Sequence, residues 1–270
     1  LKESPLPEPA PADRKSPADS SISFDNVTFT YDGAARPALM NVRFHLPQGT
    51  AYALVGPSGG GKSTIARLIP RFFDVQEGAV LVGGQDVRSI PAAELMEQIS
   101  FVFQEVHLFK KSIRDNIRAA RPNATEEEIL QAAQLAQCGD ILEKIPGGLD
   151  AVIGSKGVYL SGGEMQRIAL ARAILKDAPI VVLDEASSFA DPENEVKIQK
   201  AFEVLMKGKT VLMIAHRLST VRRMDRILVI KKGVVVEEGK HDELIEKGGV
   251  YASMWEEYQS AAQWKVGGEE

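Results

Sequence analysis

The chain has 270 residues, enough for one large domain or two small ones. Its formal net charge of -5 argues against broad nucleic-acid binding, which depends on a basic surplus. The single cysteine, Cys138, excludes an internal disulfide framework and a cysteine-rich zinc site, and is typical of a reducing compartment. No apolar run approaches the roughly 18 residues that cross a bilayer as a helix.

The first 20 residues contain five prolines among charged and small residues. This composition buries too little apolar surface to offset chain entropy, so it predicts an extended linker. The sequence begins at Leu1 without a signal-peptide core, and we expect it to be part of a longer protein. We therefore expect a linker over 1–20, one domain over 21–264 and a short tail over 265–270.

The first part of the domain has the pattern of strands. Alternating apolar and polar residues predict half-buried antiparallel strands over 21–31 and 38–46. An unbroken apolar run predicts a buried strand over 51–55, followed by a helix that includes 65–69. Further strands are expected over 79–82 and 99–103, and the second of them ends at Gln104.

A glycine-rich stretch lies between the 51–55 strand and the helix, and it matches the phosphate-loop pattern G-x-x-x-x-G-K-[ST] at every fixed position. Its residues, all predicted to bind nucleotide, are Gly56, Pro57, Ser58, Gly59, Gly60, Gly61, Lys62, Ser63 and Thr64. The glycines allow several N–H groups to face one anion. We expect catalytic Lys62 along the β- and γ-phosphates and the Ser63 hydroxyl on Mg²⁺. An incidental lysine in a glycine-rich turn would not explain the strand–helix frame.

The middle of the chain, about 105–175, has the pattern of helices. Thr125 and Glu128 have capping-box spacing, which predicts a helix from there to about 137. A second helix is expected over 164–175, after a glycine turn and before Pro179. We interpret this region as a helical subdomain inserted between strands.

The strand pattern then returns. The apolar runs 180–183 and 211–214 predict parallel strands that are covered on both faces, and a helix over 192–206 separates them. A hairpin is expected over 227–237, and a helix over about 250–263 carries aromatic residues that we assign to the core. The fold class is therefore α/β.

Polar residues follow three of the predicted strands, at the edge where open α/β sheets bind ligands. Asp184 and Glu185 follow 180–183, and these positions suit a Mg²⁺ ligand and a general base that orients water. The alternative is a strand that ends in two solvated acids. His216 could hydrogen-bond the γ-phosphate or the water, and Gln104 could ligate Mg²⁺, although a lone His or Gln at a strand end is commonly structural.

The stretch from Leu160 to Arg167 reads LSGGEMQR. Ser161 and Glu164 have capping-box spacing, so one interpretation is a well-capped helix. The other is a second anion site, made by the Ser161 hydroxyl and the N–H groups of Gly162 and Gly163. Spacing alone leaves both open.

Taken in order, these motifs resemble the nucleotide-binding domain of an ATP-binding cassette (ABC) transporter over about 21–262. The resemblance implies a P-loop NTPase core of RecA type with a mostly parallel sheet, an antiparallel β subdomain and a helical subdomain. Its cofactors would be ATP and Mg²⁺. In family order, the remaining matches are adenine-stacking Tyr31, Q-loop Gln104, the signature with Ser161, Gly162 and Gly163, Walker B Asp184 with catalytic Glu185, D-loop Asp191 and catalytic switch His216.

In this family two such domains stack head to tail, and each ATP lies between the Walker A loop of one and the signature of the other. The resemblance thus implies a second cassette, identical or different, as a partner. Residues 112–117 and the ending 239–244 are similar to exporter-type half-transporters, in which a membrane domain precedes the ATPase on the same chain. This implies a location at the cytoplasmic face of the cell inner or plasma membrane, and no nucleic-acid partner.

Two elements depart from the exporter pattern. Ser155 stands where the Gly-Glu-x-Gly element of exporters often has a carboxylate, which puts the usual contact of that carboxylate with the membrane domain in doubt. The D-loop reads Ser188-Phe189-Ala190-Asp191, where Ser-Ala-Leu-Asp is commoner. Such variation recurs in a branch that handles iron–siderophores.

Other classes of function built on the same cassette make different demands on the sequence. A DNA-repair ATPase of this type needs a long coiled coil before the signature, but only residues 65–159 separate the two motifs, without sustained heptads. A translation ATPase of this type carries two cassettes on one chain, whereas this sequence has one. The intact Asp184, Glu185 and His216 disfavour a regulator without turnover, and an importer subunit is the nearest alternative within transport.

Overall fold

The computed structural model describes residues 6–154, 157–184, 192–215 and 218–266, and the side chains of 192 and 261–266 are not described. The chain divides into two compact units, residues 1–98 with 210–270, and residues 99–209. Unit 1 contains β1 (Ile22–Phe29), β2 (Leu39–Leu46), β3 (Ala51–Val55), α1 (Lys62–Leu68), β4 (Glu77–Val82), β5 (Gln85–Asp86), α2 (Ala92–Gln98), β8 (Thr210–Ile214), α8 (Leu218–Val221), β9 (Arg226–Lys231), β10 (Val234–Gly239), α9 (His241–Lys247) and α10 (Val250–Val266). Unit 2 contains β6 (Ile99–Val102), α3 (Ile113–Arg118), α4 (Glu126–Leu135), α5 (Gly139–Lys144), α6 (Gly162–Lys176), β7 (Ile180–Asp184) and α7 (Pro192–Met206).

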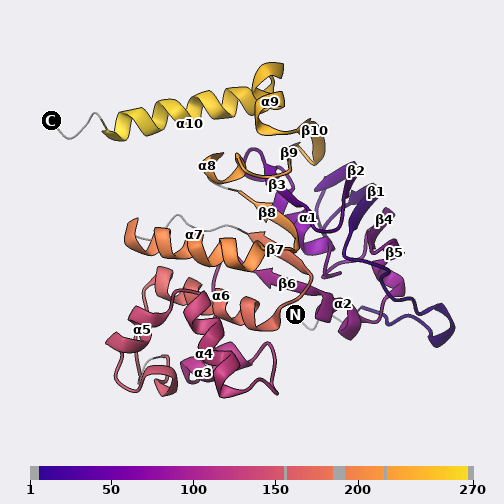
Figure 1. Cartoon of the computed structure of the whole chain (residues 1–270). Coiled ribbons are helices and arrows are strands. Elements are labelled where there is room, and N and C mark those ends of the chain that lie inside the picture. Colours follow the sequence, from indigo (N-terminus) through magenta and orange to yellow (C-terminus); the bar gives the residue numbers. More distant parts are fainter. Residues whose placement is uncertain (1–5, 155–156, 185–191, 216–217, 267–270) are drawn as a thin grey trace. The chain divides into compact units, whose positions relative to one another are not determined.

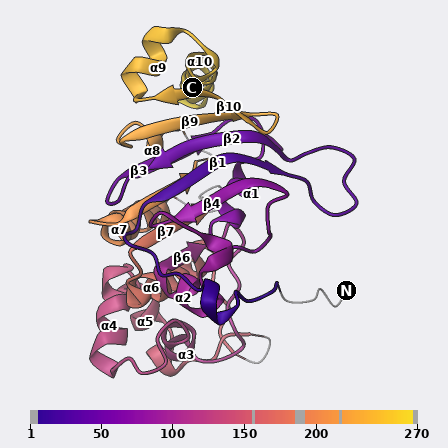
Figure 2. The same cartoon turned by 90° about the vertical axis from the view of Figure 1, so that its right-hand side faces the viewer.

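Unit 1 is built on two groups of strands (Figures 1 and 2). The order β2-β1-β4-β5 forms an antiparallel sheet. In the second group β3 pairs in parallel with both β8 and β9, and β9 forms a hairpin with β10. Each of the five residues of β8 is buried, because a parallel strand that is covered on both faces requires apolar side chains on each side. Parallel strands in the core and a separate antiparallel sheet confirm the predicted α/β fold class.

The segment before β1 contains one short 3-10 helix, Pro11–Asp13, and is held against unit 1. The Arg71 guanidinium donates a hydrogen bond of 2.9 Å to the carbonyl of Pro7, and Ala18 N–H donates to Gly83 over 3.1 Å. Arg71 is only 9% exposed and also pairs with Asp74 at 2.7 Å. Residues 6–20 are therefore docked through backbone groups rather than through apolar side chains, which is why composition did not reveal the docking.

Unit 2 contains the parallel strand pair β6–β7 and a cluster of helices around α6 (Figure 1). Helix α6 packs against α3, α4 and α7. Both predicted capping boxes form: Thr125 with Glu128 at the start of α4, and Ser161 with Glu164 at the start of α6. The helices α3 to α6 occupy the region expected to be helical.

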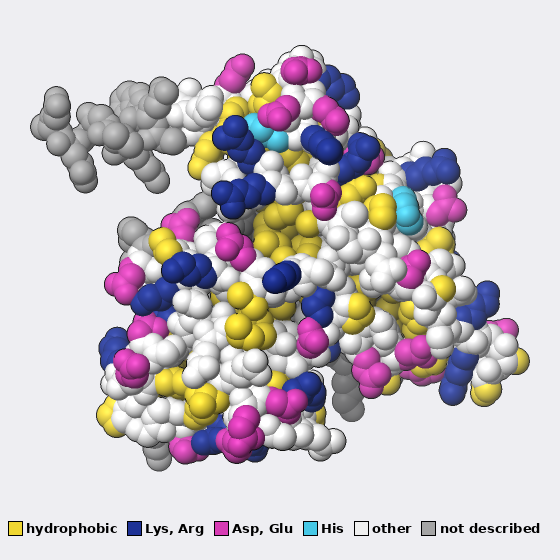
Figure 3. All heavy atoms as spheres, in the orientation of Figure 1, with side chains coloured by type: hydrophobic (Ala, Val, Ile, Leu, Met, Phe, Trp, Pro, Cys, Tyr) yellow, Lys and Arg dark blue, Asp and Glu magenta, His cyan; other side chains and the backbone are white. Residues whose placement is uncertain are grey.

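None of the helices in the described part of the chain combines the length and apolar character that a bilayer span demands. On the face that Figure 3 shows, basic and acidic side chains are interspersed.

Candidate nucleotide site

The phosphate loop of unit 1 follows β3 and closes onto α1. Gly56 has a φ of 138°, and a Cβ there would lie 2.0 Å from the carbonyl oxygen of Ile230 on β9. Gly61 has a φ of 110° and caps α1, and a Cβ there would lie 2.9 Å from the carbonyl of Ala38. Both positions therefore require glycine, because an L side chain would meet backbone atoms and adopt a strained conformation. Gly233 in the β9–β10 turn donates an N–H to the Gly60 carbonyl over 2.9 Å, which braces the loop.

Lys62 arches back over this loop. It is 7% exposed, and its Nζ donates hydrogen bonds to the carbonyls of Gly56 at 2.8 Å and Pro57 at 2.9 Å. Ser63, next in α1, is partly exposed, and the loop residues Pro57, Ser58 and Gly59 are exposed. The structure thus places the ammonium group at the loop, where the phosphate-loop pattern predicts it.

Tyr31 lies beside the start of α1. Its hydroxyl is 3.1 Å from the Thr64 hydroxyl, and its ring meets the rings of Phe29 and Phe73 edge to face. Tyr31 is half-buried, so part of the ring is accessible. Its predicted adenine stacking stays a prediction.

Three predicted ligands of the nucleotide or metal lie in unit 2. Asp184 is the last residue of β7 and is 7% exposed. Gln104 is exposed and comes two residues after β6 ends. Ser161 precedes α6, with Gly162 and Gly163 in its first turn. Glu185, Asp191 and His216, together with Ser155 and Ser188–Ala190, lie outside the described residues.

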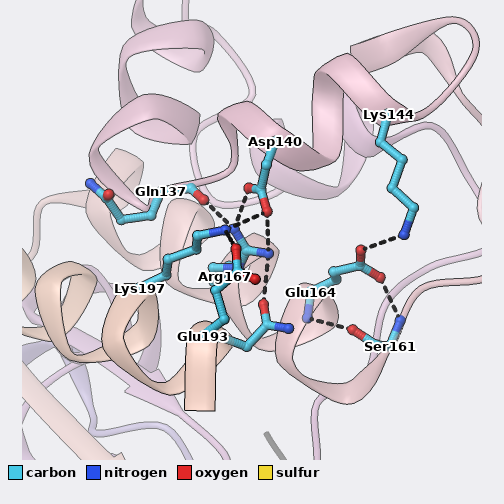
Figure 4. Close-up of polar contacts among 9 residues, drawn as sticks. Gln137, Asp140, Lys144, Ser161, Glu164, Arg167, Glu193 and Lys197 are labelled. Carbon is cyan, nitrogen blue, oxygen red and sulfur yellow. Dashed lines mark hydrogen bonds and ion pairs between the residues drawn. The ribbon is translucent and has the colours of Figure 1, made fainter. Parts of the chain in front are cut away.

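The signature turn is held by its capping box (Figure 4). Ser161 Oγ accepts from the Glu164 N–H at 3.2 Å, and Glu164 accepts from the Ser161 N–H at 2.7 Å. Burial opposes ionisation of Glu164, but these bonds and Lys144 outweigh burial and lower the pKa of the carboxyl. Because Ser161 Oγ only accepts in this turn, its own hydroxyl proton can be donated to an anion. The structure confirms the capped helix, and Ser161 and Gly162 are exposed in its first turn. The anion site at this turn stays a prediction.

The residues also suit Mg²⁺. In the described part of the chain no cluster of three or more His, Cys, Asp or Glu residues could hold a metal alone. Mg²⁺ does not need such a cluster, because it commonly takes one or two protein oxygen ligands, phosphate oxygens and water. Asp184 in unit 2 has a buried carboxylate and Ser63 in unit 1 has a hydroxyl, and each is a hard oxygen donor of this kind.

Comparison with known proteins identifies the family. The family model described as ABC transporter matches residues 39–188, which is more than half of the chain. This chain belongs to the ABC transporter family. It is 50% identical over 238 residues to the ATP-dependent lipid A-core flippase of Escherichia coli (strain K12), a match that covers 88% of this chain and 41% of the flippase. The flippase of Shigella flexneri matches equally.

A solved structure has the same ABC fold. It is described as a bacterial Atm1-family ABC exporter with ATP bound, and it matches this chain with a TM-score of 0.85 and 38% identity. The match covers 94% of this chain and 44% of the exporter. This ABC chain therefore spans less than half the length of these relatives. The recognised family, the fold and the binding of ATP follow from these comparisons, while the roles of individual site residues stay predictions.

One buried charged group of the signature stretch, the guanidinium of Arg167, has no role in the predicted site. Arg167, the last residue of the signature stretch, is 1% exposed and donates to Asp140, Asn194 and the Gln137 carbonyl. The signal in the sequence was the position of Arg167 in α6, between Gln166 and Ile168, whose side chains are buried as well. Its partners could not be found from local spacing, because they lie 27 to 30 residues away along the chain.

Proposed function

We propose that this chain is an ATP-hydrolysing cassette that dimerises on ATP and powers export across a membrane through a transmembrane domain. One observation carries the proposal: a phosphate loop and a signature peptide occur in a single chain that is 50% identical over 238 residues to an ATP-dependent flippase. The Atm1-family exporter that shares the fold supports export over import. The cassette would lie at the cytoplasmic face of the membrane.

Nucleotide binding would begin at the phosphate loop. The loop N–H groups and Lys62 would hold the β- and γ-phosphates, and Tyr31 would stack on adenine. Ser63, Asp184 and Gln104 would supply oxygen ligands for Mg²⁺, which neutralises phosphate charge when bound.

Hydrolysis would depend on residues that follow the strands. Glu185, directly after Asp184, would accept a proton from the attacking water and orient it toward the γ-phosphorus. His216 would hydrogen-bond the γ-phosphate. The protein's contribution is positioning and charge stabilisation, because phosphoryl transfer requires little covalent participation from the enzyme.

The signature would serve a second chain. Ser161 and Gly162 are exposed at the start of a capped helix of 15 residues, an arrangement that suits a phosphate presented from outside the chain. Each chain would then hold two half-sites, and the dimer two complete sites. The partner would be a second cassette, identical or different.

The membrane partner would contact a groove in unit 2. This groove has a volume of about 520 Å³ and runs beside the segment after Gln104. Phe103 and Phe109 on its wall are 47% and 55% exposed, and Arg172 lies over the Phe109 ring at 5.4 Å. A helix end of the membrane domain with an apolar tip would fit this mixed apolar and basic wall, and its movement would reach Gln104.

The test is ATP turnover as a function of chain concentration. We expect turnover to rise more steeply than linearly with concentration, because the active unit is a dimer. Glu185→Gln should reduce turnover by about 100-fold or more while ATP still binds, since general-base catalysis contributes roughly 10²–10⁴. Unchanged turnover in Glu185→Gln would overturn the base assignment. For transport, the full-length protein in liposomes should move its cargo only with ATP.

A further inference from the structure

The buried arginine of the signature helix makes an unusual set of bonds (Figure 4). Arg167 pairs in bidentate fashion with Asp140 of α5, with N–O distances of 2.5 and 3.2 Å. Its Nη2 also donates to the Asn194 side-chain oxygen on α7 over 2.8 Å. A guanidinium at 1% exposure is strongly disfavoured unless it is paired. Both Nη groups of Arg167 are bonded to partners on or next to α5 and α7, which ties these helices to α6, whereas the buried Nε has no partner among the described residues.

The same cluster includes a charged second layer. Lys197 on α7 donates to Asp140 at 2.9 Å and to Glu193 at 2.7 Å. Burial by itself would raise the pKa of Asp140, but hydrogen bonds from Arg167 and Lys197 outweigh burial and lower it to about 2. Asp140 therefore stays ionised at neutral pH and keeps Arg167 oriented.

The contact between α6 and α7 is close at the signature itself. A Cβ on Gly163 would lie 2.9 Å from the Asn194 Cβ, so the first turn of α7 touches the backbone of the signature turn. Ser161, two residues before Gly163, is the residue that faces outward. Asn194 thus contacts the signature stretch at Gly163 and accepts a hydrogen bond from Arg167 within it.

Helix α7 also has a particular place in the chain. It begins at Pro192, directly after the stretch that holds Glu185 and the D-loop residue Asp191. The residues that follow Glu185 in the sequence thus lead directly into α7, the helix that contacts the signature turn.

We propose that Arg167 and Asn194 form a positioning link, in which the first turn of α7 sets the geometry of the signature that this chain presents to its partner's nucleotide. The inference rests on the proposed function, since it takes the signature to act on a second chain. The link joins the first turn of α7 to the signature turn, so a change at Asn194 alters the half-site that this chain presents.

The test uses Asn194→Ala in a Glu185→Gln background, where the absence of hydrolysis lets the closed dimer accumulate. Alanine keeps the Cβ that touches Gly163 and removes the side-chain amide, including the oxygen that accepts from Arg167. We expect the ATP concentration for half-maximal dimer formation, measured by sedimentation, to rise about tenfold, the size that one hydrogen bond to a charged group carries. ATP affinity of the dilute monomer should not change.

Two matched variants sharpen the result. Asn194→Asp keeps an acceptor for the guanidinium and should restore closure to within about twofold of the parent. Glu193→Ala removes the neighbouring side chain, which is 80% exposed and forms an ion pair with Lys197 in the part of the chain that the structure describes. This variant should leave closure as in the parent. Equal weakening by Glu193→Ala would contradict a specific link.

A purely structural role makes a different prediction. If Asn194 only stabilised unit 2, closure and the thermal midpoint would fall together in Asn194→Ala, and the stabilising osmolyte TMAO would restore both. The positioning link predicts that closure stays weak in TMAO. Unchanged closure in Asn194→Ala would overturn the link. If the parent itself stays monomeric with ATP, the proposed dimer fails instead.

Discussion

Two glycine-rich turns precede helices in this chain, the phosphate loop before α1 and the signature before α6, and they use glycine for different physical reasons. In the phosphate loop, Gly56 and Gly61 adopt positive φ and lie against backbone atoms of neighbouring strands. In the signature, Gly162 would meet no atom within 4 Å among the described residues if it carried a Cβ, and Ser161 beside it is exposed. Gly56 and Gly61 are thus enclosed by their own unit, whereas Ser161 and Gly162 face outward and only Gly163 of the signature is packed, against Asn194.

The difference indicates what each turn lacks. The phosphate loop has its lysine in place and is braced by the β9–β10 turn, so it can bind phosphate without help from another chain. The signature has a satisfied capping box, an available hydroxyl proton and an exposed outer face. We therefore propose that the phosphate loop binds the chain's own nucleotide and that the signature completes the site of a second chain.

The largest expected effect concerns the enclosed glycine. Gly56→Ala should lower the free energy of unfolding by about 3 kcal/mol or more, because the new Cβ meets the Ile230 carbonyl and the residue is strained at positive φ. Gly162→Ala, at an open helical position, should change it by less than about 0.5 kcal/mol. Guanidinium unfolding measures both, and equal stability of the two variants would remove the distinction between the turns.

Nucleotide affinity should separate the turns next. Lys62→Ala should weaken ATP binding to the dilute chain by about 10- to 100-fold, because a charge-assisted hydrogen bond is lost. Ser161→Arg should leave this affinity within about twofold, since the signature does not contact the chain's own nucleotide. Calorimetric titration at low chain concentration gives both values. Equal loss of ATP affinity in the two variants would contradict the separate roles of the two turns.

A smaller effect compares two capping boxes in unit 2. Ser161→Ala and Thr125→Ala should each cost about 1 kcal/mol of stability, because each removes a side-chain acceptor at a helix N-terminus. Only Ser161→Ala should also raise the ATP concentration needed for dimer formation. Closure that weakens to the same extent in Thr125→Ala would mean that stability alone controls it.

The smallest effect concerns pH and the Asp140 carboxylate beneath the signature helix. The pKa of Asp140 is about 2 in the folded chain, below the ordinary value of 3.8 for an aspartate, so the folded state binds this proton less readily. Its stabilisation is complete above about pH 4 and is lost as pH falls toward 2. Asp140 is 45% exposed, so solvent screening limits its contribution to the free energy of unfolding to under about 1 kcal/mol. Asp140→Asn should therefore reduce the loss of stability between pH 5 and pH 3 in urea unfolding, and an unchanged slope would contradict the ion pair.

Much of the fold followed from local patterns. The apolar run 180–183 became β7, and the helix expected over 192–206 has those limits in α7. Both capping boxes were predicted from residue spacing, because a cap depends on side chains only three residues apart. The phosphate loop was predicted for the same reason, since its motif is continuous in sequence.

Other features depended on distant contacts and could not be read locally. The docking of residues 6–20 uses the Pro7 carbonyl and Arg71, which are 64 residues apart. The bonds of Arg167 to Asp140 and Asn194 likewise join separate helices. For the site, the predicted roles of Glu185, Asp191 and His216 concern residues outside the described part of the chain.

The central claim is that each signature completes the site of another chain, and mixing two inactive variants tests it most directly. Lys62→Ala disables the phosphate loop of one chain, and Ser161→Arg disables the signature of the other. In a mixed dimer both defects fall in one site, which leaves the second site intact if the signature acts on the partner. The account predicts that ATP hydrolysis, nearly absent in either variant alone, returns on mixing. A mixture that stays as inactive as its components would contradict it.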